Sequence, residues 1–119
     1  MRFRYLLASL LLFLPWRVAA GADTFTTNDF IQLCSTELDQ YCLSKFRLAE
    51  IAVGRVRPVN PAYRHCRPVY QFQTRELMIE SVKSQVRVLL IWLQAHPQYG
   101  PQSAAPSIGV ALHSIYPCK

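Results

Sequence analysis

The sequence lacks the short motifs that accompany the common catalytic mechanisms. It contains no G-x-S-x-G, no H-E-x-x-H and no glycine-rich phosphate loop. The sequence therefore gives no indication of a serine hydrolase, a zinc protease or a nucleotide-binding enzyme. Its three histidines, His65, His96 and His113, have no carboxylate at a spacing that would orient an imidazole ring. We therefore expect a protein that is not an enzyme and needs no cofactor.

Long apolar runs and alternating strands are also missing from most of the chain. After residue 22 the longest uninterrupted apolar stretch is 88–93, far shorter than the ~18 residues of a membrane-spanning helix. Apolar and polar residues alternate only over 70–73, which is too short to argue for a strand. Neither a membrane span nor a sheet is expected after residue 22.

The N-terminal segment, in contrast, is laid out like a secretory signal peptide. Basic residues precede an apolar run over 5–14, and small residues follow it. The run is too short to anchor the chain as an uncleaved helix, which is the alternative. We predict that residues 1–22 are removed by cleavage after Ala22, or after Ala20. The product would be a periplasmic protein with one helical domain over 23–119.

Charge is modest in this predicted mature domain. Removing the leader takes away Arg2, Arg4 and Arg17, which leaves ten basic residues against seven acidic ones. A net charge of about +3 lacks the dense Lys/Arg stripe of nucleic-acid-binding proteins. We expect no nucleic-acid partner, and no membrane partner after cleavage.

Helix signals divide the first half of the mature domain into two helices and a connector. Thr26 and Asp29 form a capping-box pattern ahead of a short apolar stripe. A second helix is predicted over about 39–53, with Gly54 as the left-handed residue after its end. Residues 55–68 carry three prolines, four arginines and His65 without a helical period, so they are predicted to form an irregular connector.

Two further helices are predicted in the second half. Thr74 would cap the longest helix, which runs to about Ala95 and is expected to be the central element. Residues 96–102 contain two prolines and a glycine and break it. The last helix begins near Ser103, and Tyr116-Pro117-Cys118 closes the chain. The predicted fold is all-α, a compact bundle of about four helices.

Helical spacing selects the expected core positions. The second helix has one apolar face, made of Cys42, Phe46, Ala49 and Val53. The longest helix has a core stripe of Met78, Val82, Val86, Leu89, Leu90 and Leu93. Three more aliphatic residues lie off that stripe, which predicts that the helix is covered on more than one side: Leu77, Val88 and Ile91.

Four cysteines in a small exported chain predict two disulfides. A zinc site with His65 is the alternative, but the cysteine spacings contain no C-x-x-C or H-x-x-x-H pair, and no metal is expected. In an up-down bundle, Cys34 and Cys42 lie at one end and Cys66 and Cys118 at the other. Of the three possible connectivities, 34–42 with 66–118 is therefore the simplest hypothesis.

The ordered motifs resemble the Rap/Tai family of immunity proteins associated with type VI secretion. The match covers about residues 30–118 and includes L-C at 33–34, Cys42, C-R-P at 66–68, W-L-x-x-H-P at 92–97 and Y-P-C at 116–118. The resemblance implies a periplasmic immunity protein that binds and inhibits a peptidoglycan-cleaving amidase effector. It also implies a small helical fold and a homodimer.

Two other functions remain open at this point. One is a periplasmic binding module of the same fold with no toxin partner. The other is an acid-stress chaperone, a class that uses lysine-rich flexible ends, whereas this chain has only Lys45, Lys83 and Lys119.

The predicted partner-binding element is the turn over residues 96–102. A protein that occupies an enzyme cleft needs a protruding, semi-rigid element with an aromatic tip. The residues of the turn assigned to partner binding are His96, Pro97, Gln98, Tyr99, Gly100 and Gln102. The alternative is that the turn only connects two helices. The basic connector over 55–67 would replace it if the partner surface is acidic.

Overall fold

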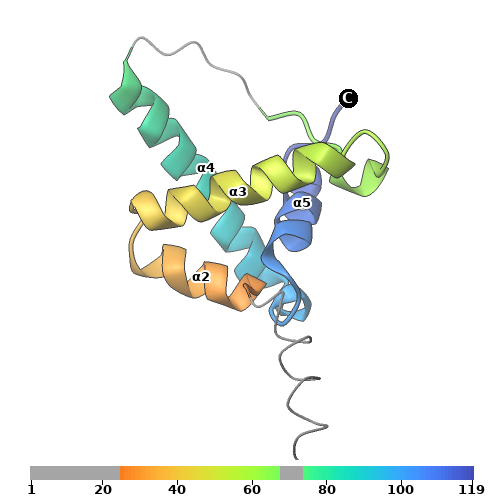
Figure 1. Cartoon of the computed structure of the whole chain (residues 1–119), viewed down its shortest axis with the longest axis horizontal. Coiled ribbons are helices and arrows are strands. Elements are labelled where there is room, and N and C mark those ends of the chain that lie inside the picture. The colour runs from red at the N-terminus through yellow and green to blue at the C-terminus, as the bar shows by residue number, and fades with distance from the viewer. Residues whose placement is uncertain (1–24, 68–73) are drawn as a thin grey trace, which may run out of the picture.

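In order along the chain, the helices are α2 (Thr27–Thr36), α3 (Gln40–Val56), η1 (Pro61–Tyr63), α4 (Arg75–Ala95), η2 (Pro97–Tyr99) and α5 (Ala104–Ile115). The computed structural model describes residues 25–67 and 74–119 (Figure 1). The predicted signal peptide, residues 70–73 and the end of the connector lie outside these residues. The described residues contain no β-strand, only an isolated bridge between Thr26 and Ser103. The predicted all-α class is confirmed.

The helices begin where side chains satisfy their first N–H groups. Thr26 accepts a hydrogen bond from the Asp29 amide and Asp29 accepts one from the Thr26 amide, a complete capping box. Asp39 accepts from the amides of Tyr41 and Cys42 at 3.0 Å. Thr74 accepts from the Leu77 amide at 3.2 Å. The predicted starts of all three helices are confirmed.

The predicted end of the second helix is wrong. Gly54 does not take a left-handed conformation; it lies inside α3, which continues to Val56. The Arg57 amide still bonds to the Val53 carbonyl at 2.8 Å. Pro58 has no N–H with which to extend the ladder, so proline rather than glycine ends the helix. The connector is also not wholly irregular, because it contains the short helix η1, which Asn60 caps.

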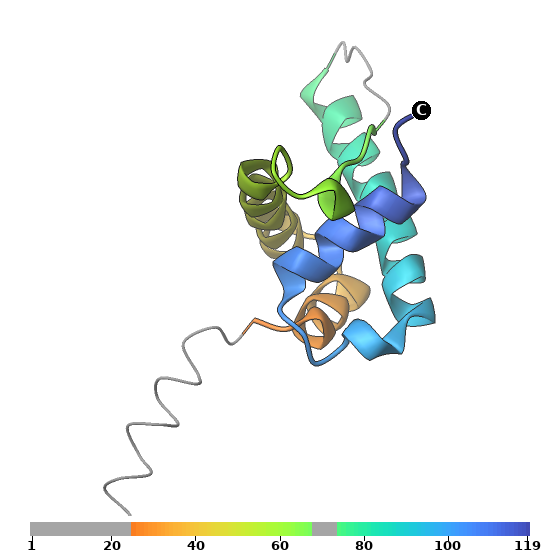
Figure 2. The ribbon, with the colours of Figure 1, turned by 90° about the vertical axis from the view of Figure 1, so that its right-hand side faces the viewer.

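The central element is α5, a short helix, rather than the longest helix α4. α5 contacts α2, α3, α4 and η1, and six of its 12 residues are buried, against four of 21 in α4. Figure 2 shows α5 running between α3 and α4. Small buried residues on α5, namely Ala104, Ser107, Gly109 and Ala111, allow the neighbouring helices to approach. The expectation that the longest helix is central is therefore wrong.

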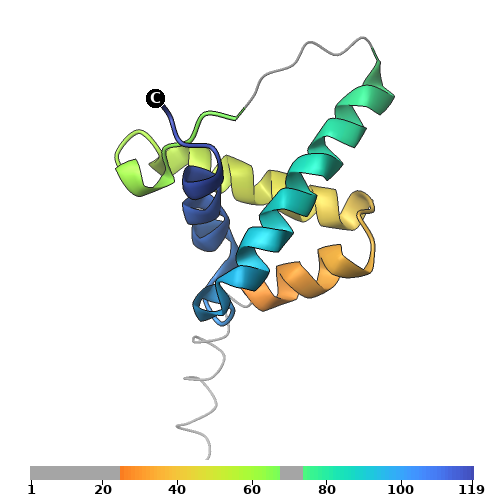
Figure 3. The same ribbon diagram turned by 180° about the vertical axis from the view of Figure 1, so that it is seen from behind.

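The fully buried residues of α4 all lie in its C-terminal half, and Val82 is partly buried against the core. The buried residues of α4 are Val86, Leu89, Leu90 and Leu93, whereas Met78 is 45% exposed. The first turns of α4 extend past the other helices (Figures 1 and 3), so the predicted core stripe is wrong at Met78 and correct from Val82 onward. Leu77, Val88 and Ile91 are exposed, and no described element of this chain covers them. On α3 all four predicted core residues are buried.

Two disulfides join the chain at opposite ends of the bundle, with the predicted pairing. Cys34–Cys42 links the last turns of α2 to the start of α3, and Cys66–Cys118 links the connector to the end of the chain. Both have Cα atoms 5.0 Å apart. The Cys66 amide also bonds to the Tyr116 carbonyl at 2.8 Å, beside the second disulfide.

Candidate protein-binding surfaces

The turn over residues 96–102 is held by the N-terminus of α2. The Asn28 amide donates to the Gly100 carbonyl at 2.9 Å, and the amide and hydroxyl of Thr27 donate to the Gln102 carbonyl at 2.8 and 3.0 Å. Gly100 is buried, and a Cβ atom at this position would lie 2.6 Å from the Asn28 amide oxygen. The backbone of the turn is therefore fixed before any partner arrives.

The aromatic residue of the turn is not a free tip. The ring of Tyr99 lies 5.6 Å from that of Trp92, and the His96 ring stacks on Trp92 at 3.7 Å. His96 also donates to the Trp92 carbonyl at 2.7 Å, and the Trp92 indole donates to Ser114 at 3.1 Å. These contacts leave His96 and Tyr99 half-buried. The residues of the turn that remain exposed are Pro97, Gln98, Pro101 and Gln102.

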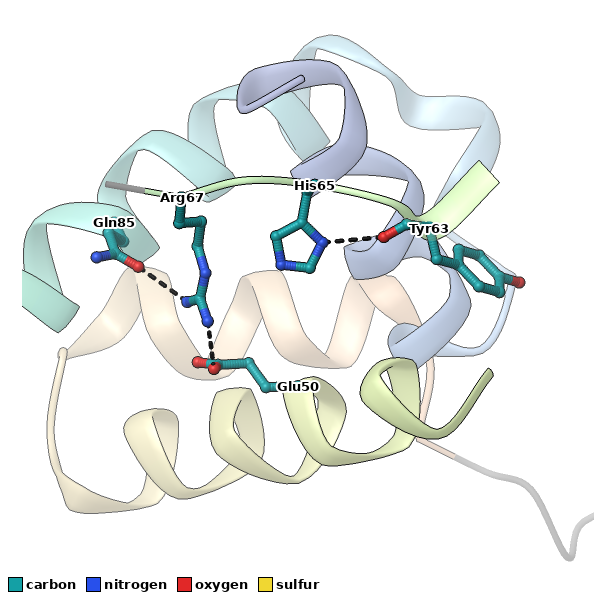
Figure 4. A network of polar contacts seen from close by, with 5 residues as sticks. All are labelled: Glu50, Tyr63, His65, Arg67 and Gln85. Atoms are coloured by element: carbon teal, nitrogen blue, oxygen red, sulfur yellow. Dashed lines mark hydrogen bonds and ion pairs between the residues drawn. The ribbon is translucent and has the colours of Figure 1, made fainter. Parts of the chain in front are cut away.

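The basic connector contains an arginine that belongs to the scaffold. Arg67 donates to Glu50 of α3 at 2.6 Å and to Gln85 of α4 at 2.9 Å (Figure 4). Its guanidinium also lies over the ring of Phe46, 5.8 Å from the ring centre. Arg67 therefore joins the connector to two helices, a role that its position in a proline-rich segment did not indicate.

His65 is the buried histidine of the connector. Its side chain is 6% exposed, and its Nδ1 atom donates to the Tyr63 carbonyl at 2.9 Å (Figure 4). Burial lowers the pKa of His65 below its usual value, the Tyr63 hydrogen bond opposes this shift, and the charges of Arg67 and Arg57 add to it. Burial thus favours the neutral form of His65, and its burial and hydrogen bond make it a structural residue of the connector.

A groove that the sequence did not predict runs between the end of α3, η1 and the start of α5. Its cavity of about 560 Å³ is lined mainly by apolar side chains, including Ala52, Val53, Val56, Val59, Tyr63 and Pro106. A neighbouring hollow of about 280 Å³ shares Ala105 and Pro106 with it and continues to Leu48 and Lys45. We call this surface the α3–α5 groove.

The only feature of the sequence that relates to this groove is the set of small residues that face each other across it. Ala49 and Ala52 of α3 and Ala105 of α5 occupy positions where larger side chains would fill the space. Helical spacing marks such residues as core or surface, and it does not reveal that two helices leave a gap between them.

The described residues contain no group of three or more histidine, cysteine or carboxylate side chains that could hold a metal ion. None of the described helices is long and apolar enough to cross a membrane. Both cysteine pairs are oxidised, and the described residues have no free thiol. The candidate sites among the described residues are three surfaces: the turn, the connector and the α3–α5 groove. No protein family, curated protein or solved structure matches this chain.

Proposed function

We propose that this chain is an exported immunity protein of the Rap/Tai type, which binds and inhibits a peptidoglycan-cleaving amidase effector of type VI secretion. The order of cysteine, proline and tryptophan motifs along the chain supports this assignment. Two disulfides in a domain of this size fit an oxidising compartment such as the periplasm. Export is tested by the intact mass of the periplasmic protein, which we expect to lack residues 1–22.

The fixed backbone of the turn is the observation that favours an inhibitor. Association costs conformational entropy, and an element that is already ordered loses less of it on binding. Three hydrogen bonds from Thr27 and Asn28 hold the turn through the carbonyls of Gly100 and Gln102. Gln98, between two prolines, is the exposed polar side chain that we expect to enter the amidase cleft.

The decisive measurement is the affinity for purified amidase effectors, with inhibition of peptidoglycan cleavage measured in parallel. We expect Gln98→Ala to weaken binding by at least about 1 kcal/mol. Tyr99→Ala should weaken it as well, whereas Tyr99→Phe, which keeps the ring against Trp92, should bind almost normally. Arg64→Ala is the control on the connector. If Arg64→Ala abolishes binding while Gln98→Ala and Tyr99→Ala leave it unchanged, the turn is not the inhibitory element.

The proposal includes a homodimer that forms through the exposed face of α4. Leu77, Val88 and Ile91 are 53%, 41% and 68% exposed and follow one stripe of α4. Such a stripe on a long helix suits a homodimer interface. Sedimentation should give a dimer for the native chain and a monomer for Ile91→Lys, with Ile51→Lys on α3 as the control. A native chain that stays monomeric at micromolar concentration would remove the dimer from the proposal.

Acidification separates this function from an acid-stress chaperone. A chaperone of that class would unfold at low pH and then prevent the aggregation of a model client protein. An immunity protein should show no such activity. Light scattering of a denatured client at low pH, with and without the chain, distinguishes the two functions.

A further inference from the structure

The α3–α5 groove has the chemistry of a peptide-binding surface. Figure 2 shows this region, in which the end of α3, η1 and α5 lie next to one another. Apolar surface extends beyond the cavity itself, because Val59 is 83% exposed and Leu48 is 58% exposed. Small-molecule sites enclose most of their ligand, whereas a groove that opens onto further apolar surface suits a longer occupant.

The walls of the groove are held in place without a partner. Tyr63 forms one side, and its ring lies against Gly109 of α5, where there is no Cβ atom to displace it. Pro106 forms part of the other side within the first turn of α5, where a missing N–H breaks no helical hydrogen bond. The groove therefore exists in the free protein.

Three arginines are next to lining residues of the groove in the sequence. Arg55 and Arg57 adjoin Val56 in the chain, and Arg64 adjoins Tyr63. All three arginines are exposed, and none has an ion-pair partner among residues 25–67 and 74–119. Neither residues 51–67 nor any position of α5 contains an aspartate or glutamate. An acidic occupant would therefore meet arginines without ion-pair partners and, along residues 51–67 and α5, no repelling carboxylate.

We propose that the α3–α5 groove binds an acidic segment of another protein, which inserts large apolar side chains between Ala52 and Pro106. Carboxylates on the same segment pair with Arg55, Arg57 and Arg64. This site is distinct from the turn over residues 96–102 and does not depend on the amidase assignment. It would be a binding site for a partner other than the amidase.

The test uses synthetic peptides and the full oxidised chain. The probe is a fluorescent amphipathic peptide in which leucine and tryptophan are separated by glutamates. One matched peptide has lysine in place of glutamate, and another has serine in place of the apolar residues. We expect only the acidic apolar peptide to bind, with an affinity that falls at least about threefold between 0.05 and 0.5 M salt.

Variants then locate the binding site. Ala52 is exposed, so Ala52→Trp should fill the groove without disturbing the core and should lower the affinity at least about tenfold. Ser44→Trp, on an exposed position of α3 that lines no part of the groove, should bind normally. Arg55→Glu should weaken binding about three- to tenfold, and Arg87→Glu, at an exposed position of α4 that lines no part of the groove, should not.

Three kinds of outcome would overturn the proposal. One is the absence of binding at peptide concentrations up to about 1 mM. Another is equal binding of the lysine peptide or equal affinity of Ala52→Trp. The third is binding to vesicles of anionic phospholipid without binding of the peptide, which would assign the arginines to a membrane surface.

Discussion

The ring of Tyr63 lies directly against Gly109 of α5. A Cβ atom at position 109 would come within 2.7 Å of Tyr63 Cδ1 and 3.0 Å of Val53 Cγ2. The absence of a side chain at this one position lets η1 and α3 close on α5 together. The same contact builds one wall of the α3–α5 groove and covers the central helix.

Gly109→Ala should therefore destabilise the protein although alanine favours helices. The added methyl group must displace the Tyr63 ring and the Val53 side chain, which should lower the free energy of unfolding by about 1–2 kcal/mol. Gly54→Ala is the matched control, because it is also helical and has no atom within 4 Å of the added Cβ. We expect this control to raise stability by about 0.5–1 kcal/mol. Urea unfolding of both variants checks the prediction, and shifts of the same sign would contradict it.

The Cys66–Cys118 disulfide should contribute more stability than Cys34–Cys42. The two bonds span 52 and 8 residues, and chain entropy assigns them about 4 and 2.5 kcal/mol. Replacing each pair with alanine and measuring the free energy of unfolding tests this order. Peptide mapping without reductant should recover only the two pairs in the native chain. A larger loss from the 34–42 pair would show that its buried position outweighs loop closure.

Stability should fall when the pH drops below about 6.5, because of His65. Burial lowers the pKa of His65 in the folded state, so the unfolded chain takes up a proton at higher pH than the folded chain does. The contribution of His65 is thus complete above the unfolded pKa and is lost as the pH falls toward the folded pKa.

The free energy of unfolding measured between about pH 7.5 and 5.5 checks this sign. His65→Gln keeps a donor for the Tyr63 carbonyl but does not titrate, so it should flatten the profile. An equal slope in the native chain and in His65→Gln would contradict the assignment.

Arg67 should matter for stability rather than for partner binding. Arg67→Ala removes its hydrogen bonds to Glu50 and Gln85 and should cost about 1–2 kcal/mol, discounted because both charged side chains are about a quarter exposed. Arg67→Lys should recover only part of this loss, because an ammonium group lacks the fork that reaches both partners. Thermal unfolding measures both variants beside Arg64→Ala, which should stay within about 0.5 kcal/mol of the native chain. Equal losses from Arg64→Ala and Arg67→Ala would show that the network is not what stabilises the connector.

Helix starts and core faces could be predicted from the sequence because they depend on residues close together in the chain. The capping pair Thr26 and Asp29 is three residues apart, and the buried positions of α3 repeat at helical spacing. The disulfide pairing, the simplest of three possible hypotheses, was also predicted correctly, since an up-down bundle places Cys34 and Cys42 at one end and Cys66 and Cys118 at the other. Helix ends were less predictable: Gly54 is compatible with the interior of a helix as well as with its end, and Pro58 decided the outcome.

Only the tertiary structure determined the surfaces on which function is proposed here. Periodicity places Met78 and Leu89 on one stripe, but how far α4 extends past its neighbours decides that Met78 is exposed and Leu89 is buried. Tyr99 rests on Trp92, and Arg67 spans α3 and α4, through contacts that depend on how the helices cross. The α3–α5 groove arises in the same way, where alanines of α3 and α5 face each other and leave space. Local sequence specifies which side chains a helix presents, and the crossing of helices specifies what those side chains meet.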